Sequence, residues 1–245
     1  IFVTPIGART GLSGGSLSVK GGVGLSLEKM NSILKIDTNN HQVVVQPGVI
    51  TEVIQDEVAK HDLFYAPDPA SRGSCFIGGN LAENSGGPRA VKYGVTKDWV
   101  LDLEVVLPNG EVIHTGAKTL KNSTGYNLTQ LMIGSEGTLG IITEATLKLL
   151  PLPKQNLLML APFEKASDAC AAVAQIFQSG VIPSALEFME KDALKLSQSF
   201  TGDYSLEIHD KVEAHLLIEV DGTDSEYLMN QCQQVLTVLE SFGCI

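Results

Sequence analysis

Glycine is distributed very unevenly along this 245-residue chain, and that distribution limits the folds open to it. Twenty of the 24 glycines precede residue 151, and four follow it. A glycine-rich stretch favours short strands joined by tight loops, because glycine adopts backbone angles closed to other residues and weakens long helices. The segment Pro151-Leu152-Pro153 marks the change. We therefore predict two domains, residues 1–150 and 151–245.

Short strands dominate the pattern of the first domain. Thr51 is a suitable N-cap for a helix to about Lys60, and Asn127 for a short helix that ends at Gly134. Asn109-Gly110 predicts a tight hairpin turn. This mixture is typical of an α+β fold built on antiparallel sheet. Apolar or alternating runs predict strands at 1–3, 23–27, 42–46, 99–107, 111–115 and 139–149.

In the second domain, predicted strands alternate with predicted helices along the chain. A strand at 157–160 precedes a helix that Ser167 or Asp168 caps and that reaches about Ser179. A short strand and helix follow, then a strand at 214–220 and a helix that Asp224 opens. The order β-α-β-α predicts a sheet covered by helices on one side. The last helix has one apolar stripe, formed by Leu228, Cys232, Val235, Leu239 and Phe242.

Residues 5–16, with the sequence PIGARTGLSGGS, carry the clearest chemical signal. Four glycines let the loop turn sharply and aim several backbone N–H groups inward, which makes a concavity suited to anions. The loop lacks the Gly-Lys-Ser/Thr of nucleoside triphosphatases, and Arg9 stands where the dinucleotide fingerprint needs glycine. For this segment alone, a flexible glycine turn between strands stays the alternative.

Charge and cysteine usage exclude several classes of function. The net charge of −11 and the pI near 4.8 argue against nucleic acid and anionic membrane surfaces as partners. Any phosphate must therefore be bound by local N–H groups. The four cysteines form no C-x-x-C pair, which suits a reducing compartment, so we expect a cytoplasmic protein; peripheral association with a membrane stays open. No membrane span or signal peptide is visible.

Two further segments combine glycine with uncharged polar residues. Residues 67–93 hold paired prolines, two glycine pairs and the two amides Asn80 and Asn84, and we expect a long irregular loop that approaches a ligand. Residues 122–142 contain the sequence GSEGTLG at 134–140, whose backbone leads into a strand. Each segment alone also fits a structural turn, and Glu136 alone fits a surface acid.

Taken together, the three segments resemble the FAD-binding domain of the vanillyl-alcohol oxidase/p-cresol methylhydroxylase (PCMH-type) flavoproteins. The branch with the greatest similarity holds glycolate oxidase flavoprotein subunits and D-lactate or D-2-hydroxyglutarate dehydrogenases. The resemblance implies a PCMH-type FAD-binding domain followed by the start of a ferredoxin-like α+β substrate domain. It rests on residues 7–8, 10–15, 77–80, 92–94, 134–140, 180–187 and 219–222.

The resemblance also implies which residues bind FAD. Gly7 to Gly15 would hold the pyrophosphate, residues around Ala70 and Gly78 would line the flavin and ribityl chain, and residues from Glu136 would hold the adenosine side. The expected set is Pro5, Gly7, Ala8, Arg9, Thr10, Gly11, Leu12, Ser13, Gly14, Gly15, Pro67, Asp68, Ala70, Ser71, Gly73, Ile77, Gly78, Gly79, Asn84, Gly86, Gly87, Tyr93, Gly94, Glu136, Gly137, Gly140, Ile141 and Ile142.

The chain departs from the family pattern at two loop positions. Members commonly have arginine where this chain has Ile6, and glycine where it has Arg9. The charge has moved three places along the loop, and we expect Arg9 to contact the phosphate. No histidine stands in the loop, where some relatives attach the cofactor, so we expect non-covalent FAD.

The activity that the resemblance implies is oxidation of a small 2-hydroxy acid by hydride transfer to flavin N5. Its electron acceptor would be a quinone, an iron–sulfur subunit, an electron-transfer flavoprotein or oxygen. The family's catalytic motifs, His-x-Gly-Asp-Gly-Asn and Gly-Glu-His-Gly, do not occur here. We therefore assign no catalytic residue and no metal ligand, and expect the chain to be a fragment, incomplete at both ends, that binds FAD without turnover. None of the five histidines matches those motifs: His41, His61, His114, His209 and His215.

Three alternatives stay open from the sequence. The first is a reductase of the same FAD fold, such as the enolpyruvyl-glucosamine reductase of cell-wall synthesis. The second is a non-catalytic FAD or nucleotide-binding module. The third is a purely structural protein, whose glycine-rich loops would then have no purpose.

Overall fold

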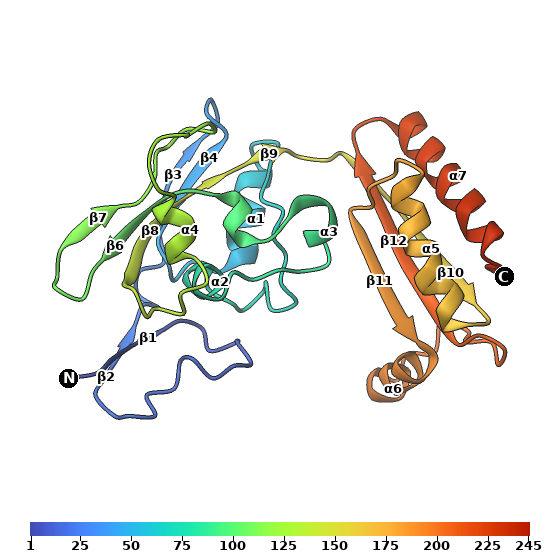
Figure 1. The fold of residues 1–245 in the computed structure, drawn as a ribbon, viewed down its shortest axis with the longest axis horizontal. Coiled ribbons are helices and arrows are strands. Elements are labelled where there is room, and N and C mark those ends of the chain that lie inside the picture. Colours follow the sequence, from blue (N-terminus) through green and yellow to red (C-terminus); the bar gives the residue numbers. More distant parts are fainter. The chain divides into compact units, whose positions relative to one another are not determined.

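The computed structural model describes residues 1–245 and divides into two compact units, Ile1–Leu152 and Pro153–Ile245 (Figure 1). Each unit has its own cluster of buried apolar side chains. Both combine sheet with helices, and the predicted α+β class is confirmed. No helix has the length and apolar character needed to cross a membrane.

A five-stranded sheet forms the framework of unit 1. Its strands lie in the order β3 (Ile33–Asp37), β4 (Gln42–Val45), β8 (Ile141–Lys148), β6 (Val100–Val106) and β7 (Val112–His114), and every neighbouring pair is antiparallel. Two small ribbons accompany it: β1 (Val3–Ile6) pairs with β2 (Val23–Ser26) in parallel, and β5 (Leu63–Phe64) pairs with β9 (Leu150–Pro151).

The core of unit 1 forms where the sheet meets its helices. Val43 and Val45 of the inner strand β4 are fully buried, as are Leu147 of the central strand β8 and Leu103 of β6. Helix α1 (Thr51–Ala59) adds Ile54 at helical spacing from Val58. The remaining helical segments are α2 (Ile77–Glu83), α3 (Ala90–Tyr93), η1 (Thr96–Trp99) and α4 (Leu128–Met132).

The prediction of a long irregular loop at 67–93 is wrong, because α2 and α3 lie within it. Helix α2 contains the pair Gly78-Gly79, which the sequence pattern indicated as a loop. Gly78 has a packing reason: a Cβ atom there would lie 2.6 Å from Pro47 Cβ, far closer than packing allows. Asn84 ends the helix in the left-handed conformation, at φ 53°.

Two predicted caps are also wrong. Thr51 is the first residue of α1, with Ile50 at the N-cap, and its buried hydroxyl accepts a hydrogen bond from Asn80 instead. Helix α5 (Ala166–Gln178) begins before Ser167, because the Glu213 carboxylate accepts from the Ala166 N–H at 3.0 Å and so supplies the cap from another element. Asn127 does cap α4, and Asp224 does cap α7, as predicted.

Two predicted strand ends are shifted. The strand expected at 1–3 begins at Val3 and runs through Pro5 to Ile6, because β1 pairs on one side only and so tolerates a residue without an N–H. Trp99 closes η1 rather than opening β6, and its indole N–H donates to the Tyr93 carbonyl.

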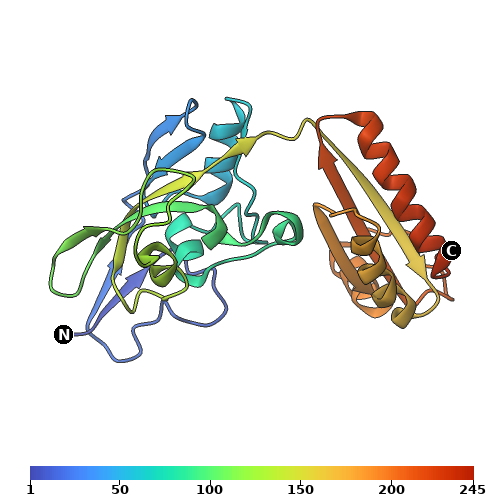
Figure 2. The same cartoon turned by 45° about the horizontal axis from the view of Figure 1, so that its top comes forward.

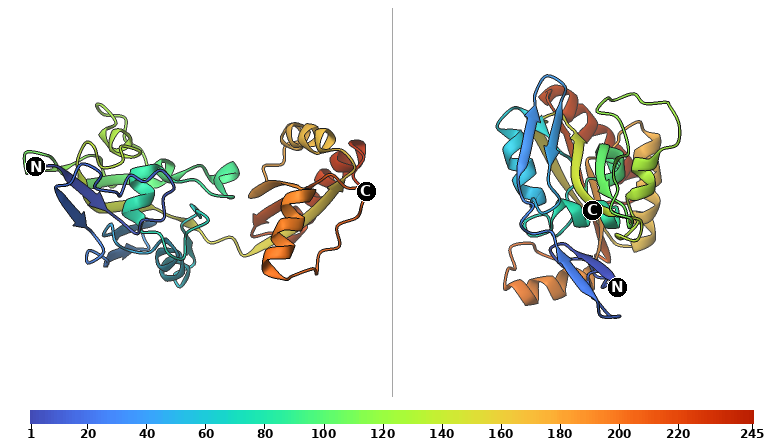
Figure 3. Two further views of the ribbon diagram at one scale, coloured as in Figure 1. Left: turned by 90° about the horizontal axis from the view of Figure 1, so that it is seen from below. Right: turned by 90° about the vertical axis from the view of Figure 1, so that its left-hand side faces the viewer.

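Unit 2 is a three-stranded antiparallel sheet with two packed helices. The strand order is β10 (Gln155–Phe163), β12 (Ala214–Gly222), β11 (Ala185–Glu190). Helices α5 and α7 (Ser225–Ser241) run along the strands (Figure 2), and their buried residues join those of β10 and β12 in one core. Helix α6 (Lys191–Thr201) has no buried residue and lies away from these two helices (Figure 3).

Candidate functional site

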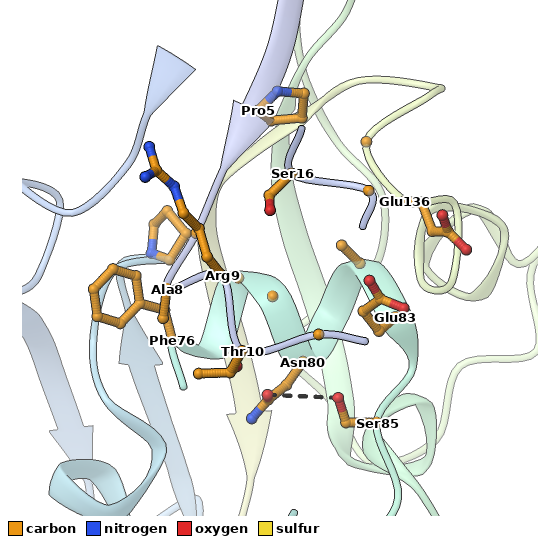
Figure 4. Close-up of a pocket in the computed structure, with 18 of the residues that line it drawn as sticks. Pro5, Ala8, Arg9, Thr10, Ser16, Phe76, Asn80, Glu83, Ser85 and Glu136 are labelled. Atoms are coloured by element: carbon orange, nitrogen blue, oxygen red, sulfur yellow. Dashed lines mark hydrogen bonds between the residues drawn. The ribbon is translucent and has the colours of Figure 1, made fainter. Parts of the chain in front are cut away.

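Unit 1 contains a cavity of about 500 Å³, within the size range of small-molecule sites (Figure 4). Three segments far apart in the sequence line it: the loop after β1, helix α2 with its flanks, and residues 135–142 that lead into β8. These are the three glycine-rich segments of the sequence.

The loop from Gly7 to Ser16 presents unpaired backbone to this cavity. None of its ten N–H groups donates a hydrogen bond within the protein; the next donor along the chain is Leu17, which bonds to the Gly14 carbonyl at 3.0 Å. Gly14 takes a left-handed φ of 78°, which turns the loop. Ten adjacent free donors in one loop are chemically suited to an anion with several oxygens.

Arg9 is the single cationic side chain that lines the cavity. Its backbone is left-handed, at φ 61°, a conformation that glycine adopts without strain. The φ angle of Arg9 therefore fits the glycine that the family resemblance expects at this position. The guanidinium forms no ion pair, and Figure 4 shows it pointing away from the two acids of the cavity.

Helix α2 contributes a flat wall and a buried polar anchor. A Cβ atom at Gly79 would meet nothing within 4 Å, whereas one at Gly7 would contact the Gly79 backbone at 3.8 Å, so the loop lies directly over the helix. Asn80 is buried; its Nδ2 donates to Thr51 Oγ1 at 2.6 Å, and its Oδ1 accepts from Ser85 Oγ at 3.5 Å (Figure 4). This anchor fixes α2 to α1.

Residues 134–137 are tied to the end of α2 by their backbone. The Gly134 N–H donates to the Leu81 carbonyl, and the Glu136 N–H donates to the Ala82 carbonyl. Glu136 is left-handed at φ 52°, and Gly137 at 73°, packed against Pro5. The turn therefore closes the cavity beside the first loop.

Most of the predicted binding residues line the cavity. In the first loop and its strand these are Pro5, Gly7, Ala8, Arg9, Thr10, Gly11, Leu12, Ser13 and Gly15; elsewhere they are Ala70, Ser71, Gly78, Gly79, Gly86, Glu136, Gly137, Gly140, Ile141 and Ile142.

The structure places the other predicted residues outside the cavity, and several have a packing role. A Cβ atom at Gly87 would lie 2.6 Å from the carbonyl carbon of Asp68, and Ile77 is fully buried in the core. Tyr93 packs edge-on against Phe64 and Trp99. The residues outside are Gly14, Pro67, Asp68, Gly73, Ile77, Asn84, Gly87, Tyr93 and Gly94.

Sequence reasoning missed a group of lining residues that α2 and its neighbours present. The signal was the helical spacing from Gly79 to Glu83, which a loop prediction hides. Leu27 and Pro47 lie outside the three glycine-rich segments, and the folded chain brings them to the cavity. The missed residues are Ile6, Ser16, Leu27, Pro47, Pro69, Phe76, Asn80, Ala82, Glu83, Ser85 and Ser135.

No histidine or cysteine lines this cavity. His215 lies in unit 2, beside a second cavity of about 470 Å³; its Nδ1 is buried without a partner, and burial lowers its pKa. His114 Nδ1 lies 3.1 Å from Asp102 Oδ2 on the sheet of unit 1. No group of three or more metal-ligating side chains is present.

Comparison with known families gives two matches along the chain. Residues 1–116 match the family model described as "FAD binding domain", and residues 152–245 match "FAD linked oxidases, C-terminal domain". A solved structure of alkyldihydroxyacetonephosphate synthase shares the fold, with a TM-score of 0.82 at 24% identity, over 99% of this chain and 46% of that one.

Curated proteins of higher identity include three dehydrogenases or oxidase subunits. A D-lactate dehydrogenase of Anaerostipes hadrus is 46% identical over 100% of this chain, and the glycolate oxidase subunit GlcD of Bacillus subtilis is 45% identical over 90%. A D-2-hydroxyglutarate dehydrogenase of Xanthomonas citri is 42% identical over 80%. The chain spans about half the length of these relatives: 52%, 46% and 41% respectively.

Proposed function

Because this chain belongs to the FAD-linked oxidases and carries their FAD-binding domain, we propose that the protein oxidises a small 2-hydroxy acid with FAD held non-covalently in the cavity of unit 1. The three relatives above are named for D-lactate, glycolate and D-2-hydroxyglutarate, all 2-hydroxy acids. This shared chemistry supports 2-hydroxy acids as the substrate class, and the proposal names the class rather than one acid.

One observation carries the cofactor site: the unpaired N–H groups of the loop from Gly7 to Ser16, nine of whose ten residues line the cavity. A diphosphate offers several oxygens to such donors, and backbone dipoles bind it without a cluster of cations. The chain is acidic and the cavity holds one arginine, so these N–H groups are the main source of attraction for an anion.

The other lining residues fit a planar ring system and its polar chain. Gly79 offers a face without side chain, and Ala70 and Ser71 approach the same space with small side chains. Ile141 and Ile142 add an apolar surface that excludes water. When bound, FAD supplies a two-electron acceptor for the substrate hydride. With no histidine or cysteine in the lining, the cavity offers no attachment residue of the usual kind.

We assign no catalytic residue in this chain. The reaction needs a base that takes the hydroxyl proton and groups that orient the substrate carboxylate. We assign neither role to a residue of this chain. The electron acceptor stays a choice among a quinone, an iron–sulfur subunit, an electron-transfer flavoprotein and oxygen. We also propose that the protein acts in the cytoplasm, with peripheral association with a membrane as the alternative. Cell fractionation tests this location.

An absorption spectrum of the purified full-length protein tests this function. We expect flavin bands, and we expect D-lactate, glycolate or D-2-hydroxyglutarate to bleach them under anaerobic conditions. Bands that resist all three acids but bleach with NADPH would favour the enolpyruvyl-glucosamine reductase alternative. The absence of flavin, even after reconstitution with FAD, would refute the cofactor site.

A further inference from the structure

Glu83 places a carboxylate inside the glycine loop, where an anionic ligand would lie. The residue is the last of α2, and its Oε1 accepts a hydrogen bond from Ser13 Oγ at 3.3 Å. A Cβ atom at Gly11 would lie 3.2 Å from the same oxygen, and one at Gly15 would lie 3.9 Å from it. One carboxylate oxygen thus accepts from Ser13 and lies close to Gly11 and Gly15, and Figure 4 shows the side chain directed at the loop.

This carboxylate has no cation beside it. Glu83 forms no ion pair, and the guanidinium of Arg9 points away (Figure 4). A second carboxylate lies on the other side of Gly15: Glu136 Oε2 is 3.5 Å, and Glu83 Oε1 is 3.9 Å, from the position of a Cβ atom there. The Ser13 hydroxyl is therefore the one hydrogen-bond donor that the structure gives the Glu83 carboxylate, and the loop N–H groups beside it stay unpaired.

A carboxylate and a phosphate are interchangeable occupants of such a loop, because both are anions that accept hydrogen bonds from N–H and O–H donors. Both cannot occupy it together without strong repulsion, since two charges about 4 Å apart repel each other even near a protein surface. The position of Glu83 is thus one that a diphosphate would have to share or take over.

We propose that the Glu83 carboxylate is an internal competitor for the diphosphate-binding loop, and that it weakens FAD binding and must withdraw when the cofactor binds. The proposal rests on the FAD site proposed above. It assigns Glu83 a role in cofactor affinity and exchange, distinct from any part in the oxidation itself.

The test measures the dissociation constant of the full-length apoprotein for FAD by quenching of flavin fluorescence. Glu83→Gln keeps the shape and removes the charge, and we expect it to bind FAD about tenfold more tightly. Riboflavin lacks the diphosphate, so its affinity should be the same in both proteins. Glu111→Gln, an exposed acid in the hairpin turn, has the same change in net charge and should match wild type.

Three results decide between the possibilities. Equal or weaker FAD binding by Glu83→Gln would overturn the proposal and assign Glu83 to loop fastening or to a cofactor hydroxyl. An equal gain for riboflavin would also overturn it, since the diphosphate would then be irrelevant; if riboflavin binds neither protein, the FAD comparison decides alone. Should wild type fail to bind FAD at all, the proposed function itself fails. Glu83→Ala replaces the glutamine variant if that one unfolds.

Discussion

The two units of this protein use glycine and side chains in opposite ways. Unit 1 contains 20 of the 24 glycines and a loop with ten unpaired N–H groups. Unit 2 contains four, and its sheet and helices are held by a regular core of aliphatic side chains. In unit 1 the backbone itself is the surface offered to a ligand, whereas in unit 2 the backbone is satisfied within strands and helices.

This difference predicts where each unit tolerates substitution. A site made of backbone groups depends on the absence of side chains, so adding one atom there is more harmful than changing a charge. A core made of side chains depends on volume, so removing atoms is the harmful change. The predictions below test this contrast, beginning with the largest expected effect.

Adjacent glycines of α2 provide the sharpest test. Gly78→Val should destabilise unit 1 by about 3 kcal/mol and abolish FAD binding, because its Cβ would lie 2.6 Å from Pro47 Cβ and 3.0 Å from the Pro47 carbonyl. Gly79→Ala meets no atom within 4 Å and should leave stability within about 1 kcal/mol, while its methyl group in the cavity weakens FAD binding about tenfold.

Urea unfolding and FAD titration of both variants measure these effects. A folded Gly78→Val protein with normal FAD affinity would show that α2 shifts freely, and would end the argument that this glycine is a packing residue. Equal FAD affinity of Gly79→Ala and wild type would instead show that FAD does not contact α2 at Gly79.

The core of unit 2 should respond to lost volume. Leu228→Ala removes a fully buried side chain of α7 and should cost about 3 kcal/mol, with FAD affinity unchanged. Leu236 lies on the same helix and is 42% exposed, so Leu236→Ala should lower the stability of unit 2 by less than about 0.5 kcal/mol. Hydrogen exchange of unit 2 amides measures both. A loss of FAD binding in Leu228→Ala would contradict the separation of roles between the units.

The same contrast explains what the sequence could predict. Alternation in residues 99–107 predicted β6, and the apolar stripe of α7 predicted its buried face, because side-chain periodicity reports burial directly. The capping side chains of Asn127 and Asp224 were equally readable. In these elements the local signal and the tertiary packing agree.

The failures occur where tertiary contacts override local signals. Gly78-Gly79 is a poor helix sequence, yet α2 forms with Ile77 and Leu81 buried in the core, and Pro47 leaves no room for a side chain at Gly78. The cap of α5 comes from Glu213, 47 positions away. Glu83 lines the cavity only because α2 is helical, so a loop prediction had no reason to single it out.

Arg9 allows the backbone requirement of unit 1 to be measured directly. Arg9→Gly should stabilise unit 1 by about 1 kcal/mol, because it removes a side chain from a residue held at φ 61°. FAD affinity should stay within about twofold, since backbone N–H groups carry the proposed recognition and the guanidinium, which forms no ion pair, points away from the two acids of the cavity (Figure 4). A large loss of FAD affinity would show that Arg9 turns toward the phosphates and would favour side-chain over backbone recognition.

The smallest expected effect concerns the pH dependence of unit 2. Burial lowers the pKa of His215, and unfolding returns it to its ordinary value of about 6.5. Below that pH the unfolded chain binds a proton that the folded chain does not, so unit 2 loses stability as the pH falls from 7.5 to 5.5. His215→Leu should lose less over that interval. The matched control is His209→Gln, an exposed histidine of the same cavity, which should keep the wild-type dependence. Equal pH dependence in wild type and His215→Leu would mean that the imidazole is solvated in the folded state, and that unit 2, like the loop of unit 1, opens its interior to water.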